Sequence, residues 1–189
     1  MKGIRKLCDE EGILMICDEV QCGMGRTGAM FAWQAYDIKP DIMSMAKAIG
    51  SGIPVGAFAM TEEVAKYSLE PGDHGTTYGG NPLACTAGSK TIEIFEKKHL
   101  VEHVQKVGAY LTKKLEELVE EYDTVKAVKG KGLMQGIQVT KPISEITGAA
   151  LKEGLLIIGA GSDVIRFVPP LIIELEQVDE MIRILKKAL

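Results

Sequence analysis

Two side chains of opposite charge each follow a short apolar run. The apolar run 13–17 ends at Asp18, and the segment 41–46, a second candidate for a buried strand, ends at Lys47. Short runs that are apolar throughout are typical of strands buried on both faces of a parallel sheet. The carboxyl ends of such strands share one edge, outside which ligands bind. Asp18 and Lys47 are therefore predicted to reach one crevice, although a structural ion pair or two unrelated loop charges would give the same pattern.

A lysine at such an edge has a specific chemical use. Its amine can form a Schiff base with an aldehyde. A nearby acid can keep a heteroaromatic nitrogen protonated, which makes the ring a better electron sink. A lysine and an acid in these roles are the arrangement that holds pyridoxal phosphate. The sequence thus offers Lys47 as a covalent anchor and Asp18 as the partner of a ring nitrogen.

Two further segments carry groups suited to anions. Thr76 and Thr77 lie in the glycine-rich stretch 74–82, which leads into a predicted helix and suits a phosphate. A plain helix-entry loop would look the same, and no Gly-Lys-Ser/Thr follows as in a Walker loop. Arg166 lies in an otherwise apolar strand. There it either faces solvent or binds a carboxylate through two parallel hydrogen bonds.

Strand and helix patterns alternate over the first half of the chain, as in a mostly parallel α/β layer. In this half we predict helices at 2–11, 31–36, 61–68 and 82–94, and strands at 13–17, 41–46 and 54–60. In the second half, which reads as a smaller α/β unit, we predict helices at 101–122, 144–153 and 177–188, and strands at 133–139, 155–158 and 164–168. The boundary is placed after residue 98, which gives domains of 1–98 and 99–189.

The composition is that of a soluble globular protein, with 46% hydrophobic and 25% charged residues. A net charge of −4 does not favour a nucleic-acid surface. The four cysteines lack CxxC spacing, so we expect reduced thiols and no metal site. No apolar run is long enough for a transmembrane span or a signal peptide. We therefore expect a cytoplasmic protein without membrane or nucleic-acid partners.

Five stretches of the chain resemble class III aminotransferases, in the order and with the spacing of that family. They are the stretches 16–28, 40–50, 74–84, 129–134 and 165–171. The similarity is greatest to the acetylornithine aminotransferases of arginine biosynthesis. It implies the α/β architecture of fold-type I pyridoxal-phosphate transferases. Residues 1–98 would be the C-terminal part of the cofactor-binding large domain, and 99–189 the small C-terminal α/β domain.

The resemblance also implies roles for single residues. Asp18 would pair with the pyridine nitrogen, Val20 would pack against the ring and Gln21 would bond the phenolic oxygen. Glu19 belongs to the same cofactor-binding stretch. Lys47 would hold the cofactor as a Schiff base and then act as the general base and acid of catalysis.

Three more residues receive roles in the same way. Thr77 would contact the cofactor phosphate, in this family usually that of the neighbouring subunit. Thr76 would lie near the substrate, and Arg166 would bind a substrate carboxylate. The implied protein is a homodimer that transfers an amino group between N-acetylornithine, or a related omega-amino substrate, and 2-oxoglutarate.

Several alternatives share these features. Ornithine, succinylornithine and 4-aminobutyrate aminotransferases and glutamate semialdehyde aminomutase could all carry the pair Asp18 and Lys47. The resemblance covers only the C-terminal half of the family, so the isolated chain is expected to be an incomplete, inactive fragment. A non-catalytic remnant that oligomerises is the alternative from a different class. A generic nucleotide-binding domain is disfavoured, because no GxGxxG follows the first strand.

Overall fold

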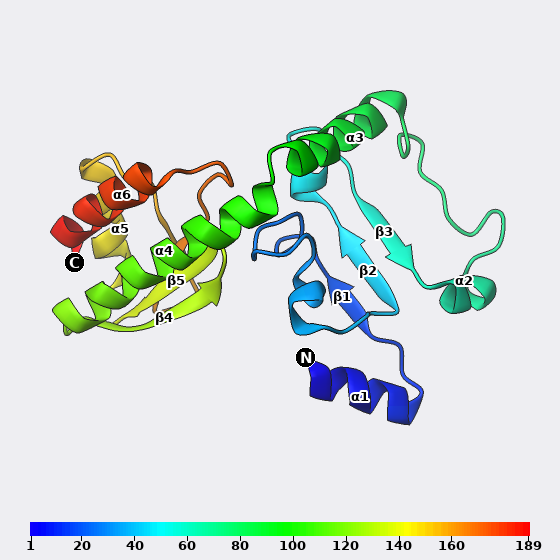
Figure 1. Cartoon of the computed structure of the whole chain (residues 1–189), viewed down its shortest axis with the longest axis horizontal. Helices are drawn as coiled ribbons and strands as arrows, with labels where there is room; N and C mark the ends of the chain where they lie inside the picture. The colour runs from blue at the N-terminus through cyan, green and yellow to red at the C-terminus, as the bar shows by residue number, and fades with distance from the viewer. The chain divides into compact units, whose positions relative to one another are not determined.

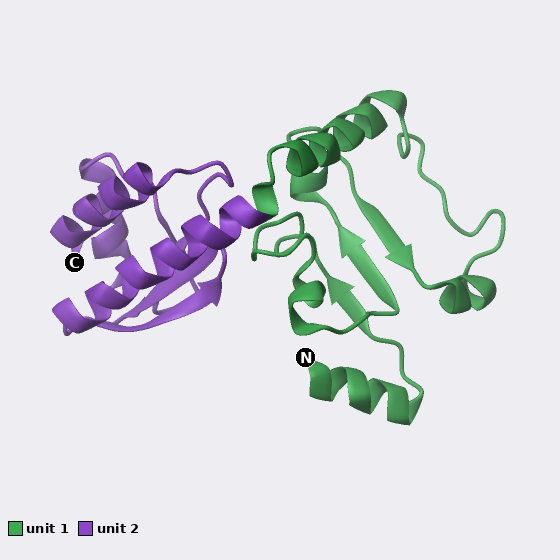
Figure 2. Ribbon diagram, viewed as in Figure 1, with its two compact units in different colours: residues 1–101 green, residues 102–189 purple.

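The computed structural model describes residues 1–189, and the chain divides into two compact units, Met1–Val101 and Glu102–Leu189 (Figures 1 and 2). Each unit contains one β-sheet, of three strands in the first and four in the second. The assignment of 1–98 and 99–189 as the parts of a large and a small domain stays a prediction.

The sheet of the first unit contains β1 (Ile16–Asp18), β2 (Ile42–Met45) and β3 (Ala57–Met60), in that order. Strands β1 and β2 are parallel, with Ile16 opposite Ile42 and Asp18 opposite Ser44. Strand β3 runs antiparallel to β2. The carboxyl ends of β1 and β2 therefore lie at the same edge of the sheet.

Short sequence signals set the helices of this unit. They are α1 (Lys2–Glu11), α2 (Glu62–Ser68), α3 (Pro82–Lys97) and two 3-10 helices, η1 (Ala32–Tyr36) and η2 (Lys47–Ile49). Gly12 ends α1 in the left-handed conformation, with φ 64°. Thr61 caps α2, and Asn81 caps α3 with Pro82 at its first position. Four of these helices were predicted from the sequence, whereas η2 was not.

The prediction that the strands of the first unit are buried on both faces is wrong. In β1 only Cys17 is buried, whereas Ile16 is 64% exposed, and Ile13 and Leu14 just before it are 58% and 54% exposed. The buried cluster is small, formed by Met15, Cys17 and Ile38. One face of β1 has no cover from this chain, so its residues alternate between buried and exposed.

The second unit has helices on an antiparallel sheet. Its elements are α4 (Leu100–Glu121, which starts two residues before the unit), β4 (Val125–Lys131), β5 (Met134–Val139), α5 (Ile143–Lys152), β6 (Ile158–Ala160), β7 (Val164–Phe167) and α6 (Leu175–Ala188). The strand order is β4-β5-β7-β6. Strand β4 was not predicted, because three lysines and a glycine interrupt its apolar pattern. Strand β6 was predicted at 155–158 and lies further along the chain.

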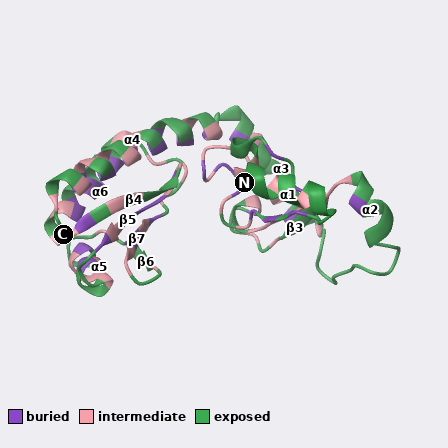
Figure 3. Ribbon diagram, turned by 90° about the horizontal axis from the view of Figure 1, so that it is seen from below, coloured by how far each residue is buried: buried purple, intermediate pink, exposed green.

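A single large core stabilises the second unit. Along α4, Val104, Leu111, Leu115 and Leu118 are fully buried. Their spacing of three, four or seven residues places them on one helix face, as the sequence predicts. They share one cluster with apolar residues of β5, β7, α5 and α6. Figure 3 shows this buried layer between the helices and the sheet.

Candidate active site

Asp18 and Lys47 stand at the carboxyl ends of the neighbouring parallel strands β1 and β2. Asp18 is the last residue of β1 and lies opposite Ser44, while Lys47 begins η2, with only Ala46 between it and the end of β2. Both side chains belong to exposed residues, and they form no ion pair with each other. The structure thus brings the two residues to one sheet edge, and the alternative of a structural ion pair is not realised.

The Asp18 carboxylate is oriented through one of its two oxygens. Its Oδ1 accepts hydrogen bonds from the Val20 amide at 3.0 Å and from the Ser44 hydroxyl at 3.3 Å. Its Oδ2 has no partner within the chain. A carboxylate held in this way can accept a further hydrogen bond from a protonated ring nitrogen.

Lys47 has a backbone conformation that is unusual for a residue other than glycine. Its φ is 48°, which is in the left-handed region that costs a side-chain-bearing residue about 1–2 kcal/mol. Such strain gathers at functional sites when the surrounding structure enforces it. The Lys47 amine makes no hydrogen bond or ion pair, so it is available for a ligand.

Glu19 is turned away from this edge and lies inside the loop that follows β1. The residue is only 3% exposed. Its carboxylate accepts hydrogen bonds from the Ala32 amide at 2.9 Å and the Trp33 amide at 3.0 Å. The Cys22 thiol donates to it at 3.3 Å. This arrangement was not predicted, because the backbone donors Ala32 and Trp33 are more than ten residues away from Glu19 along the chain.

The other two predicted cofactor residues of this loop are more accessible. Val20 is half-buried and Gln21 is exposed. Gln21 makes no side-chain hydrogen bond, and Val20 contributes its amide to Asp18. Asp18, Val20 and Gln21 are therefore open to a ligand, whereas the Glu19 carboxylate is occupied. A direct contact between Glu19 and a cofactor stays an untested prediction.

Thr76 and Thr77 lie in an exposed loop before α3. Their hydroxyls have no partner in the chain. Asn81 ends this loop, since its side chain donates to the Tyr78 carbonyl at 2.9 Å and accepts from the Ala84 amide at 3.0 Å. The ring of His74 meets the ring of Phe58 edge-on at 5.1 Å, which ties the loop to β3. The loop thus carries two unpaired hydroxyls a few residues before the capped N-terminus of α3.

Arg166 lies in the second unit, on β7 between Gly136 of β5 and Ile158 of β6. It lines an open cavity of about 530 Å³ whose other walls are mostly apolar, among them Ile173 and Met181. Its guanidinium has no ion pair, and its Nε is buried without a hydrogen-bond partner. A buried donor without a partner is costly. The arrangement would suit a carboxylate ligand.

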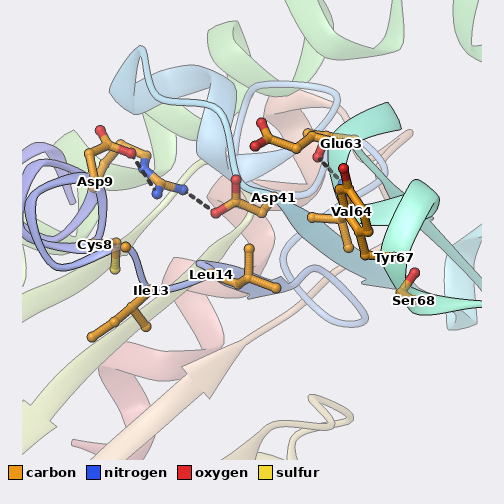
Figure 4. Close-up of a pocket in the computed structure, with 12 residues that line it drawn as sticks. Cys8, Asp9, Ile13, Leu14, Asp41, Glu63, Val64, Tyr67 and Ser68 are labelled. Carbon is orange, nitrogen blue, oxygen red and sulfur yellow. Dashed lines mark hydrogen bonds and ion pairs between the residues drawn. The ribbon is translucent and has the colours of Figure 1, made fainter.

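A second cavity, of about 520 Å³, lies at the opposite end of β2 (Figure 4). On its wall the Arg5 guanidinium contacts Asp41 at 2.6 Å and Asp9 at 2.7 Å. Asp41 also accepts from the Met15 amide at 2.7 Å. Burial opposes ionisation of Asp41, but these two donors outweigh it and lower its pKa. Asp41 precedes β2 and Lys47 follows it, so this polar cluster is at the opposite end of β2 from the candidate site. It joins α1 to the start of β2.

Neither metal nor membrane features are found. No group of three or more His, Cys, Asp or Glu side chains could hold a metal ion. His103 instead contacts the Ile173 carbonyl at 2.9 Å. No helix combines the length and the apolar character that crossing a bilayer requires.

Comparison with known proteins decides the family. The sequence pattern described as aminotransferase class-III matches residues 1–189. The chain belongs to the class III aminotransferases. Among curated relatives, acetylornithine aminotransferase of Methanocaldococcus jannaschii is 47% identical over 98% of this chain and 46% of that protein. Its counterpart in Caldanaerobacter subterraneus is 46% identical over 100% of this chain and 48% of that protein.

Solved structures of aminotransferases match the fold. Ornithine delta-aminotransferase of Plasmodium falciparum has a TM-score of 0.92 at 33% identity, covering 100% of this chain and 50% of that one. Acetylornithine aminotransferase of Elizabethkingia anophelis has a TM-score of 0.90 at 32% identity, covering 99% of this chain and 50% of that one. The fold-type I prediction is thereby confirmed. The chain spans about half the length of the relatives it matches.

Class III aminotransferases depend on pyridoxal phosphate. The groups at the sheet edge fit that cofactor, because Lys47 offers an unpaired amine and Asp18 offers an unpaired oxygen on an oriented carboxylate. The predicted cofactor and the predicted enzyme family are therefore confirmed at the level of the family, while the roles of single residues remain to be tested.

Proposed function

We propose that this chain carries the lysine and acid of a pyridoxal-phosphate-dependent transamination between N-acetylornithine, or a related omega-amino substrate, and 2-oxoglutarate. The observation that carries the proposal is the position of Asp18 and Lys47 at the carboxyl ends of adjacent parallel strands, each with an unpaired polar atom. This chain spans about half the length of its relatives, and the proposal concerns the activity of the whole protein.

The proposed chemistry divides between cofactor and chain. When bound, pyridoxal phosphate withdraws electrons from the substrate carbon that carries the amino group. Lys47 would hold the cofactor through its Nζ until the substrate amine takes its place. The freed Nζ would then remove the proton from the substrate carbon and deliver it to the carbon at the other end of the 1,3-shift. Asp18 Oδ2 holds the proton on the pyridine nitrogen, which keeps the ring electron-poor.

The remaining residues bind and orient. Val20 packs against the ring and Gln21 donates to its phenolic oxygen. Thr77 binds the cofactor phosphate, in the proposed homodimer that of the neighbouring subunit. Thr76 lies near the substrate. Arg166 binds a substrate carboxylate, a role that its unpaired guanidinium supports.

The amino donor is proposed from the names of the relatives. Several curated relatives are acetylornithine aminotransferases, whereas matching solved structures include an ornithine delta-aminotransferase. N-acetylornithine is therefore the first choice and arginine biosynthesis the proposed pathway. A panel that also contains ornithine, succinylornithine and 4-aminobutyrate, tested on a full-length relative, would rank the donors.

One experiment tests the cofactor site directly. The purified chain is mixed with pyridoxal phosphate, reduced with borohydride and digested, and the modified lysine is mapped by mass spectrometry. We expect stoichiometric labelling at Lys47. The variant Lys47→Arg should lose it, whereas Lys39→Arg, a change at another exposed lysine, should keep it. Labelling scattered over many lysines would contradict the proposed role of Lys47.

A second measurement addresses turnover by the isolated chain. We propose that the chain alone is inactive, because it matches only about half of each relative. A coupled assay that detects glutamate, with N-acetylornithine and 2-oxoglutarate as substrates, should therefore give no signal above the Lys47→Arg control. Turnover that depends on Lys47 would contradict this expectation and would assign a complete site to the chain.

A non-catalytic oligomer is the second candidate. It is favoured by the exposed apolar side chains of Ile13, Leu14 and Ile16, since uncovered apolar surface of this kind marks contact sites. Light scattering after size exclusion measures the mass in solution. A stable oligomer that captures no pyridoxal phosphate at Lys47 would favour this candidate over the enzyme.

A further inference from the structure

We infer that Glu19 is a positioning residue of the cofactor site. It acts by fixing the loop that presents Asp18, Val20 and Gln21, without itself touching the cofactor. The inference rests on the proposed function, because it assigns Glu19 a task in the same site. It replaces the expectation that Glu19 is one of the direct cofactor contacts.

The contacts of the Glu19 carboxylate close the loop. Oε2 accepts from the Ala32 amide and Oε1 from the Trp33 amide, across 13 and 14 residues of sequence. Both donors belong to the first turn of η1, where backbone amides lack partners within the helix. Glu19 is 3% exposed, so these bonds form away from water. Glu19 thereby joins the start of the loop to its end.

A carboxylate suits these donors better than an amide would. Each oxygen faces at least one N–H group, and an ionised carboxylate only accepts. The Cys22 thiol is a third donor to the carboxylate and donates to Oε2. Burial and the contact with Glu19 raise the pKa of Cys22 to about 11, so the thiol keeps its proton and donates. Glutamine in place of Glu19 would point an NH₂ group at one of the amides.

We call the contact of the Glu19 carboxylate with the amides of Ala32 and Trp33 the clamp, and the backbone connects it to Asp18. The Glu19 amide donates to the Ser44 carbonyl at 2.9 Å, which extends the pairing of β1 with β2. The Ser44 hydroxyl and the amide of Val20, the residue after Glu19, both donate to Asp18 Oδ1. The residues that flank Glu19 are therefore those with predicted cofactor roles. Loosening its side chain would move the donor that orients the Asp18 carboxylate.

The test compares Glu19→Gln with Val64→Ala. Val64 is buried in α2, so its truncation weakens the first unit without touching the loop. Trp33 is the only tryptophan of the chain, and its emission therefore reports on the clamped loop. Pyridoxal phosphate is titrated into each protein while this emission is followed. The absorbance of the bound cofactor is recorded before borohydride reduction, and the labelling of Lys47 is measured after it.

Glu19→Gln is expected to weaken the apparent affinity for pyridoxal phosphate by about tenfold, in line with the loss of one hydrogen bond to a charged group. It should also shift the Trp33 emission before any cofactor is added, and change the absorbance of the unreduced cofactor per site. Val64→Ala should leave the affinity within about twofold of wild type, because it lies outside the network.

The outcomes separate the two proposals. If the wild-type chain captures the cofactor at Lys47 and Glu19→Gln does so with unchanged affinity and absorbance, the inference about Glu19 fails while the proposed function stands. If Val64→Ala loses as much affinity as Glu19→Gln, the effect is one of general stability and the inference also fails. If the wild-type chain captures nothing at Lys47, the proposed function fails and the inference with it.

Discussion

The two units of the molecule differ in how much apolar surface they bury. The unit Glu102–Leu189 has one core that includes Leu111, Leu115 and Leu118, all fully buried. The unit Met1–Val101 has a buried apolar cluster of three residues, and many of its large apolar side chains are exposed. Yet the predicted cofactor residues belong to this less buried unit.

The candidate site therefore depends on specific polar contacts more than on a large core. In the first unit, Glu19 holds a loop and Asp41 joins α1 to the start of β2. Both act through directional bonds to backbone amides. In the second unit, apolar packing stabilises the sheet and its helices, and the Arg166 Nε on this sheet has no hydrogen-bond partner. Substitutions should therefore affect the two units through different mechanisms.

The largest effect is expected from Leu115→Ala in the second unit. Removing this fully buried side chain leaves a cavity and should lower the free energy of unfolding by about 3 kcal/mol. Leu83→Ala is the matched change in the first unit, and because Leu83 is 67% exposed it should cost under about 0.5 kcal/mol. Hydrogen exchange of peptides from each unit in increasing urea measures both. Equal losses of free energy in the two variants would contradict the difference in apolar burial between the units.

Gly23→Ala should come next, at about 1–3 kcal/mol for the first unit. A methyl group at Gly23 would lie 2.7 Å from the Glu19 carbonyl oxygen and 3.1 Å from the Phe31 ring, so the loop would have to move. The urea midpoint of the first unit and the affinity for pyridoxal phosphate should both fall. Retention of both values would show that the loop tolerates the displacement and that the clamp is looser than its geometry indicates.

Asp41→Asn tests the polar contacts at the other end of β2. The pKa of Asp41 is lower in the folded chain than the value near 4 of an unfolded carboxyl. Its contribution is therefore complete above about pH 4 and is lost as the pH falls through the folded value. The wild-type first unit should melt at lower temperature below pH 4. The variant should melt a few degrees lower near pH 7 and show a weaker dependence on acid. If the melting temperature of the variant fell with acid as much as that of the wild type, the acid sensitivity would come from other carboxyls.

The smallest effect is expected from Gly148→Ala, and it should be stabilising. Gly148 lies within α5, and a methyl group there would meet no atom within 4 Å. Alanine should therefore raise the stability of the second unit by about 0.5–1 kcal/mol, since glycine is unfavourable inside a helix. Calorimetry of the two proteins measures the shift. A loss of stability would contradict the open space that surrounds Gly148.

Much of the fold was predictable because its signals are local. Gly12 after α1, Asn81 with Pro82 before α3 and the apolar face of α4 each fix an element within a few residues. The edge that joins Asp18 and Lys47 was also predictable, because both residues directly follow strand patterns. These features need no knowledge of distant residues.

What the sequence did not predict depends on distant partners. The exposure of Ile16 follows from the lack of cover on one face of β1, which an apolar run cannot reveal. Strand β4 forms by pairing with β5 although its sequence is rich in lysine. The clamp at Glu19 requires amides at 32 and 33. The left-handed backbone of Lys47 is set by the chain around it.

The short link between α3 and α4 has a practical consequence. Helix α3 ends at Lys97 and α4 begins at Leu100, so only Lys98 and His99 lie between them, and His99 has a φ of 49°. A recombinant fragment that starts at His99 would retain all of α4 and the whole core of the second unit. Such a fragment is small enough for complete assignment by NMR. Small carboxylic acids could then be titrated against the Arg166 resonances, which separates the anion chemistry of that side chain from everything that happens at Lys47.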